Sequence, residues 1–276
     1  MLNGIVGFVT ACNKSYLAEL KINKQSMLLR KYIAIAAVQF CISISAFGWG
    51  WEGHKMTADI ANEHLTSAVK DSLKLYLSDM TIQQASTWMD EIKKDSTMDY
   101  LKPMHYINIE SGQSYDPASK DNIIYELNKV IAELGDRSHH SKQEIAMEIK
   151  ILIHLVGDLH QPLHVGYGSD RGGNNIKLTV LGDSSNLHRV WDTDIIKREH
   201  IYTVDLEKVL AKGNIGNTGK IDIIEWMNES RSELRAVYNF HDNINQTYLD
   251  ANKELVEKQL IRSGLKMATL LNSLFK

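Results

Sequence analysis

The segment from His154 to His164, with the sequence HLVGDLHQPLH, holds a dense set of residues that can bind a metal ion. His154 and Asp158 are four residues apart, so on a helix both side chains leave the same face, one turn apart. Pro162 ends such a helix and lets His164 point in a different direction. Imidazole nitrogens and carboxylate oxygens are the ligands that zinc takes in hydrolytic sites. The segment therefore predicts a hydrolytic metal site carried by a helix.

The same spacing of histidine and aspartate recurs farther along the chain, in the sequence NLHRVWD. His188 and Asp192 are again four residues apart, on a second predicted helix. A lone pair of this kind is most often a surface ion pair or a helix cap. Two such pairs, together with His164 and the apolar neighbours of the first pair, favour metal binding because bare histidine and aspartate are costly to bury.

Shorter pieces upstream offer further ligands. Asp90 ends the sequence WMD, and His105 begins the sequence HYIN. Considered alone, each residue has a simpler interpretation: Asp90 as an acidic residue on the surface, and His105 as a core histidine hydrogen-bonded to the backbone. A chain that began at Trp49 would offer a free amine and a carbonyl that can chelate one metal, and His54 lies close enough in sequence to join them.

The elements that must position these residues are mostly helices. Apolar residues repeat at helical spacing over residues 54–64, 66–77, 81–94, 122–134, 141–159, 186–196, 221–238 and 243–275. Only 175–180 alternates like a strand, and the turn signal Gly182-Asp183 follows it. The stretch 100–118 contains Pro103 and Pro117 and is expected to be irregular. We expect an all-α fold, a single compact multi-helix domain with one small β-ribbon.

The start of the chain resembles a secretory signal. Arg30 and Lys31 precede an apolar run over 32–45, and the small residues Ala46 and Gly48 flank Phe47. This pattern predicts a signal peptide over 27–48, cleaved before Trp49. Alternatives are a buried N-terminal helix and a lipoprotein signal at 9–12, which has no positive charge before it. Residues 1–26 would be an untranslated or cleaved extension, residues 49–276 the functional domain, and the protein secreted or periplasmic.

Cleavage there would change the charge and the cysteine content. The full chain has 31 basic and 34 acidic residues, and removing residues 1–48 leaves 26 against 33, a net charge of −7. This charge is unfavourable for gripping a polyanion with a broad basic face, so positive charge would have to be concentrated at a site, as bound metal would do. Cys12 and Cys41 would both be lost. Without a disulfide, stability would come from the core or from metals.

The motifs of this chain, and the order in which they occur, resemble those of a known protein family. WGxxGH, WxD, HYxN, HxxGDxHQPLH, GGN and NLHxxWD follow one another across nearly all of 49–276. This arrangement resembles the zinc-dependent, single-strand-specific nucleases of the S1/P1 type, a family that shares its all-α fold with the bacterial zinc phospholipases C. The resemblance implies cleavage of single-stranded DNA or RNA to 5′-phosphate products, with 3′-nucleotidase activity. Fungal and plant relatives carry disulfides, so a chain without them points to a bacterial-type member.

The resemblance also implies three Zn²⁺ ions and their ligands. One ion would be held by Asp90, His105, His154 and Asp158. A second would be held by the amine and carbonyl of Trp49, by His54 and by Asp158, which bridges the pair. The third would be held by His164, His188 and Asp192. Asp90 and Asp158 would thereby serve catalysis. Zinc lowers the pKa of a bound water to about 7, so no side-chain general base is required.

Further residues are expected to contact the substrate. Lys93 stands where the family often has arginine, and it can meet a phosphate only as a point charge. Near the GGN motif, Arg171, Asn174 and Asn175 are candidates to orient phosphate, although Arg171 can equally be a solvated loop charge. The remaining candidates, implied to line a base pocket, are Tyr106 and Asn108. Stacking on Tyr106 demands an unpaired base; the alternative is that Tyr106 is a core aromatic.

Two other functions remain open from the sequence. A zinc phospholipase C has the same fold, but its family places glutamate where this chain has Asp192. A zinc-stabilised binding protein without catalysis belongs to another class; structural zinc sites are usually closed and rich in cysteine, whereas the third site here has three protein ligands and no thiol. For the nuclease we expect single-stranded nucleic acid and nucleotides as substrates, a monomer, and no stable membrane association after signal cleavage.

Overall fold

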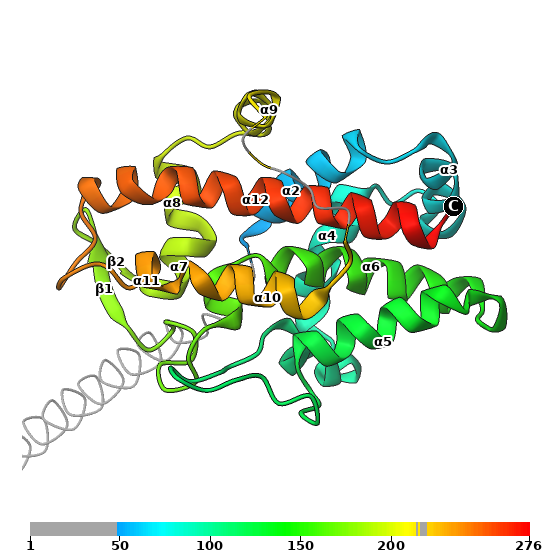
Figure 1. Ribbon diagram of the computed structural model, residues 1–276, viewed down its shortest axis with the longest axis horizontal. Coiled ribbons are helices and arrows are strands. Elements are labelled where there is room, and N and C mark those ends of the chain that lie inside the picture. Colours follow the sequence, from blue (N-terminus) through cyan, green and yellow to red (C-terminus); the bar gives the residue numbers. More distant parts are fainter. Residues whose placement is uncertain (1–48, 214, 216–219) are drawn as a thin grey trace, which may run out of the picture. The chain divides into compact units, whose positions relative to one another are not determined.

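The computed structural model describes residues 49–213, 215 and 220–276. The expected extension at 1–26 and the expected signal peptide at 27–48 lie outside the described residues. Within the described part of the chain, helices dominate and one antiparallel two-stranded sheet accompanies them (Figure 1), which confirms the all-α class with a small ribbon. Among these residues, the structure has no helix that combines the length and the apolar character of a membrane span.

The main helices lie close to the ranges expected from the apolar pattern. They are α2 (Trp51–Glu63), α3 (Ser67–Leu77), α4 (Ile82–Glu91), α5 (Ile123–Gly135), α6 (Lys142–Leu159), α10 (Ile223–Ser232), α11 (Leu234–Val237) and α12 (Gln246–Leu274). Local signals set their starts. Thr81 and Ser141 each form a capping box with the residue three positions on, so orphan N–H groups of the first turn find partners. The ribbon pairs β1 (Lys177–Val180) with β2 (Asp183–Asn186).

Several elements differ from the expectation. The stretch expected to be irregular begins with a 3-10 helix, Ser96–His105, so His105 ends a helix. The single helix expected over 186–196 is α7 (Leu187–Arg189), a π-helical turn (Val190–Asp194) and α8 (Ile195–Arg198). Helix α9 (Thr203–Ala211) was not expected. Its apolar stripe is short, formed by Leu206, Val209 and Leu210 at helical spacing, and only Leu206 is fully buried.

Helix α6 occupies the middle of the first core. Every residue from Ile151 to Leu159 is buried, so this half of the helix is covered on all sides. Helices α4 and α5 pack against it, and α2 packs against α4 and α12 (Figure 1). Because α2, α4 and α6 meet one another, polar side chains on their facing surfaces must lie close together away from water.

The contact of α2 with α12 requires a glycine. A Cβ atom on Gly264 would lie 2.6 Å from Cβ of Ile60 and 2.8 Å from the carbonyl oxygen of Thr57. Only a residue without a side chain permits this approach of the two backbones. Helix α12 thereby presses α2 onto the side of the core that carries the candidate ligands.

Candidate metal centre

Three groups of buried histidine and aspartate side chains each bring their ligand atoms within 4.8 Å of one another. The groups are His54, Asp90 and His154; His105, His154 and Asp158; and His164, His188 and Asp192. All eight side chains that the sequence proposed as metal ligands fall in these groups, and the first two groups share His154. The structure therefore brings together residues spread over more than a hundred positions of the chain.

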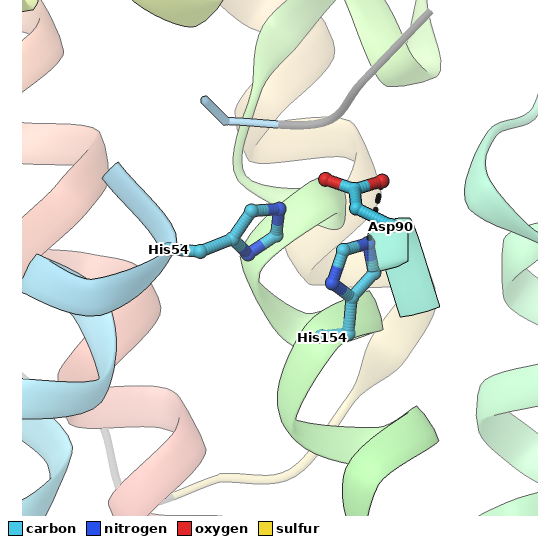
Figure 2. Close-up of side chains that lie close together, drawn as sticks. All are labelled: His54, Asp90 and His154. Carbon is cyan, nitrogen blue, oxygen red and sulfur yellow. Dashed lines mark ion pairs between the residues drawn. The ribbon is translucent and has the colours of Figure 1, made fainter. Parts of the chain in front are cut away.

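The first two groups lie where α2, α4 and α6 meet. His54 comes from the first turn of α2, Asp90 from the end of α4, and His154 from α6; Figure 2 shows the three side chains converging. The rings of His54 and His154 stack, with centroids 4.1 Å apart. Asp158 follows His154 by one turn, and its Oδ2 lies 2.8 Å from Nδ1 of His105.

Several polar atoms in these groups are buried and have no hydrogen-bond partner among the described residues. They include both ring nitrogens of His54, both carboxylate oxygens of Asp90, and Oδ1 of Asp158. Two of these oxygens have charged or chargeable neighbours, since Asp90 Oδ1 lies 2.5 Å from Lys93 Nζ and Asp158 Oδ1 lies 3.2 Å from His54 Nε2. Nδ1 of His54 and Oδ2 of Asp90 have no hydrogen-bond partner among the described residues. Because buried polar atoms are normally hydrogen-bonded, these two atoms beside a convergent set of histidine and aspartate fit bound cations.

Backbone carbonyls orient the histidines. In three of them Nδ1 donates to a main-chain oxygen: His154 to Ser86, His164 to His105 and His188 to Gly172, at 2.7, 2.7 and 2.6 Å. This bond fixes the neutral tautomer and presents Nε2 to the group, the arrangement that metal-binding histidines generally have.

The electrostatics of the first two groups suits a cation. Burial, followed by the charge of Lys93, lowers the pKa of His105 to about 4, and burial also lowers the pKa of His54. Burial disfavours the charge of Asp158, yet His154 and His164 hold the pKa of this carboxyl well below its usual value. At neutral pH these shifts favour neutral imidazoles at His54 and His105 and an ionised carboxylate at Asp158, the forms in which these groups bind metal. At His154 the effect of burial is outweighed by the charges of Asp158 and Asp90, which raise its pKa.

The third group is held by short irregular helices. His164 lies on the 3-10 helix Pro162–Val165, His188 on α7, and Asp192 on the π-helical turn. His188 Nε2 lies 3.4 Å from Asp192 Oδ2. Burial raises the pKa of Asp192 well above its usual value, and the hydrogen bond from Gln161 offsets only part of this effect. A cation bound at this group would stabilise the ionised form of the Asp192 carboxylate, which burial otherwise disfavours.

Two residues that support the groups were not singled out from the sequence. Gln161 is fully buried; its Nε2 donates to Asp192 Oδ1 at 2.5 Å, and its Oε1 accepts from the backbone N–H of Leu163 at 2.5 Å. A Cβ atom on Gly157 would lie 2.7 Å from Nδ1 of His54. Both are spelled out in the HxxGDxHQPLH motif, which is the signal that could have found them.

The first described residues lie against the third group. The N–H of Gly50 donates to the carbonyl oxygen of Asp192 at 2.9 Å, and a Cβ atom on Gly50 would lie 2.6 Å from Oγ1 of Thr193. Trp49 is fully buried, beside Gly53 of α2. The segment that begins at Trp49 thus lies between α2, which carries His54, and the turn that carries Asp192.

A pocket of about 80 Å³ lies beside the third group. The residues that line it are Tyr106, Asn108, Leu163, His164, Arg171, Gly172, Asn174 and His188. Four of the expected substrate residues are among them.

Tyr106 is 40% exposed, which excludes the interpretation of this ring as a core aromatic. Asn175 is exposed on the same turn but is not among the lining residues. Lys93 lies at the first group instead, paired with Asp90.

Known proteins of similar sequence are nucleases. The sequence profile of the family described as S1/P1 Nuclease matches residues 49–276. Endonuclease 1 of Arabidopsis thaliana is 25% identical over 284 residues, covering 89% of this chain and 93% of that protein. Nuclease S1 of Aspergillus oryzae is 27% identical over 179 residues, 60% of each chain. A solved structure of Clostridium perfringens alpha-toxin aligns with a TM-score of 0.44 at 15% identity, covering 84% of this chain and 65% of that one. The chain therefore belongs to the S1/P1 nuclease family, and as a nuclease it is a hydrolase of phosphodiester bonds.

Proposed function

We propose that the protein is a zinc-dependent endonuclease that hydrolyses single-stranded DNA or RNA to 5′-phosphate products and also acts as a 3′-nucleotidase. The observation that carries this proposal is the position of the pocket. A half-exposed Tyr106 and a buried group of metal-binding side chains share its wall, through His164 and His188. A base in the pocket would place its sugar and phosphate beside that group.

The proposed cofactors are three Zn²⁺ ions. Asp90, His105, His154 and Asp158 would hold one ion, and the amine and carbonyl of Trp49 with His54 and Asp158 would hold a second. His164, His188 and Asp192 would hold the third. When bound, zinc supplies a water of lowered pKa and neutralises charge on the phosphate. Three protein ligands at the third group leave positions for substrate, as catalytic sites require.

The chain's own residues would bind and orient the substrate. Lys93, held at 2.5 Å from Asp90, would offer a phosphate oxygen a point charge beside the paired ions. Arg171 and Asn174 line the pocket and would contact phosphate, with Asn175 on the same turn. Asn108 would hydrogen-bond the edge of a base. Tyr106 would stack on the face of the base, and only an unpaired base offers this face.

The proposal predicts strand selectivity that depends on the third group. The holoprotein should cleave a single-stranded oligonucleotide roughly 100-fold faster than the same strand annealed to its complement, because freeing a paired base costs a few kcal/mol. Asp192→Asn should lose most of this activity, while the exposed Asp242→Asn serves as the matched control and should keep it.

Product analysis and a lipid substrate complete this experiment. Mass spectrometry of the fragments should find 5′-phosphate ends. Equal cleavage of single and paired strands would contradict the role of Tyr106. Hydrolysis of phosphatidylcholine with no cleavage of nucleic acid would overturn the proposed function, and so would a zinc-loaded protein that hydrolyses no phosphoester.

We also propose that residues 27–48 are removed on export, that the protein is secreted or periplasmic, and that it is a monomer. The support for processing is chemical. The amine of Trp49 can bind a metal only after the peptide bond to Gly48 has been cut, and the segment at Trp49 and Gly50 lies against Asp192.

A further inference from the structure

Arg231, at the end of α10, joins two segments that are far apart in the sequence. Its Nη2 donates to the carbonyl oxygen of Ile109 at 2.8 Å. Its Nη1 donates to the carbonyl oxygens of Val165 and Gly166, the latter at 3.3 Å. One half-buried guanidinium therefore satisfies three main-chain acceptors from two different parts of the chain.

These two segments lie side by side and both contribute residues to the wall of the pocket beside the third group. The first carries Tyr106 and Asn108, and the second carries His164. Their backbones are paired directly, since Ile107 N–H donates to His164 O at 2.8 Å and Ile109 N–H donates to Gly166 O at 3.0 Å. Arg231 donates at the end of this pairing formed by Ile109 and Gly166, where Gly166 O accepts both from Ile109 N–H and from the guanidinium.

Arginine is suited to this position. Its guanidinium presents five N–H donors in a rigid planar fork, whereas lysine offers one compact charge on a flexible stem. The guanidinium also lies over the ring of Tyr167, 5.9 Å from its centroid. Arg231 itself is not among the residues that line the pocket, so any influence on substrate must act through the two segments.

We infer that Arg231 is a positioning residue that sets the separation of Tyr106 and Asn108 from His164, and thereby the fit of the pocket to a nucleobase. This inference rests on the proposed function, in which the pocket takes a base. The structural claim, that Arg231 holds the two pocket segments together, does not depend on which substrate the pocket takes.

Hydrogen exchange tests the structural claim without activity. In Arg231→Met, the amides of Ile107 and Ile109 should exchange at least about tenfold faster than in the wild type, because their pairing with the second segment is no longer fixed. The amides of α6 should be unchanged. Arg235→Met, an exposed arginine one turn on, is the matched control and should exchange like the wild type. Wild-type exchange at Ile107 and Ile109 in Arg231→Met would overturn the inference.

Kinetics of the zinc-loaded enzymes test the consequence for substrate. Arg231→Met and Arg231→Lys should raise KM for an oligothymidylate roughly tenfold with little change in kcat, because stacking in the pocket is weakened. For an oligonucleotide of the same length with abasic sugars, both variants should match the wild type. An equal loss on both substrates would overturn the positioning role. A wild-type enzyme that cleaves neither substrate would count against the proposed function, while the exchange rates still decide the role of Arg231.

Discussion

At the scale of single residues, the third group depends on how Gln161 is held. This side chain is fully buried and makes one hydrogen bond with each end of its amide, to Asp192 Oδ1 and from the N–H of Leu163. It therefore fixes one carboxylate oxygen of Asp192, which leaves Oδ2 toward His188, and it anchors the short helix that carries His164. Neighbours of ligands act in this way in metal sites generally.

Replacing Gln161 should weaken one metal site selectively. In Gln161→Leu we expect the affinity of one of the three proposed ions to fall roughly 10–100-fold, since Asp192 loses its partner. Elemental analysis during titration with a chelator measures the number of ions retained. Asn252→Leu removes a buried amide on α12 that donates to the carbonyl of Tyr248 in the same helix, and should keep the wild-type metal content. Equal metal retention in Gln161→Leu and the wild type would contradict this role.

At the scale of elements, the first two groups depend on the close approach of α2 to α6. The ring of His54 fits against α6 only because residue 157 has no side chain, since a Cβ atom there would lie 2.7 Å from Nδ1 and 2.9 Å from Cε1. The ring is the end of a side chain that can rotate away. The steric conflict is therefore expected to displace the ligand and to leave the two helices in place.

Gly157→Ala should accordingly cost metal binding and little folding stability. We expect the variant to lose one ion, and in the presence of a chelator to unfold within about 1 kcal/mol of the wild type. Native mass spectrometry and denaturant unfolding measure the two quantities. Gly135→Ala, at the end of α5, is the matched control, because a Cβ atom there meets nothing within 4 Å. A variant Gly157→Ala that retains every ion would show that His54 has room to move and still bind.

At the scale of the whole molecule, the segment at Trp49 and Gly50 lies beside the turn that carries Asp192. Residues from α2, α4, α6 and the π-helical turn surround the groups, and the segment at Trp49 and Gly50 lies between α2 and Asp192. Cleavage before Trp49 would expose a free main-chain amine, a metal ligand that none of the side chains provides. A domain of net negative charge would then hold its positive charge in bound metal, at the place where a phosphate must be received.

One added residue should therefore disable the enzyme. A mature protein that carries an extra alanine before Trp49 should bind one ion fewer and lose activity at least about tenfold, because an amide nitrogen does not ligate zinc as a free amine does. The same alanine added after Lys276 is the control. Sequencing of the secreted protein should find Trp49 first. Full activity with the added N-terminal residue would refute the role of the amine.

The sequence by itself determined the features that are encoded within a few turns of chain. The starts of α4 and α6 follow from capping boxes at Thr81 and Ser141, and the apolar pattern places the main helices within a few residues. The HxxxD spacing puts His154 and Asp158 on one face of α6. The ordered motifs carried the family and the whole set of candidate ligands, because each motif is short and local.

Only the tertiary structure decided which ligands share a group and what supports them. His154 joins two groups because α2, α4 and the 3-10 helix before Tyr106 all pack against α6, a fact that no local pattern contains. The contacts of Arg231 with Ile109 and Val165 span 122 and 66 positions. Helix α9, whose apolar stripe covers only about one turn, was not expected from the sequence, and a regular helix was predicted where the chain forms the π-helical turn. Contacts across the chain depend on packing, and packing is fixed only when all the elements are in place.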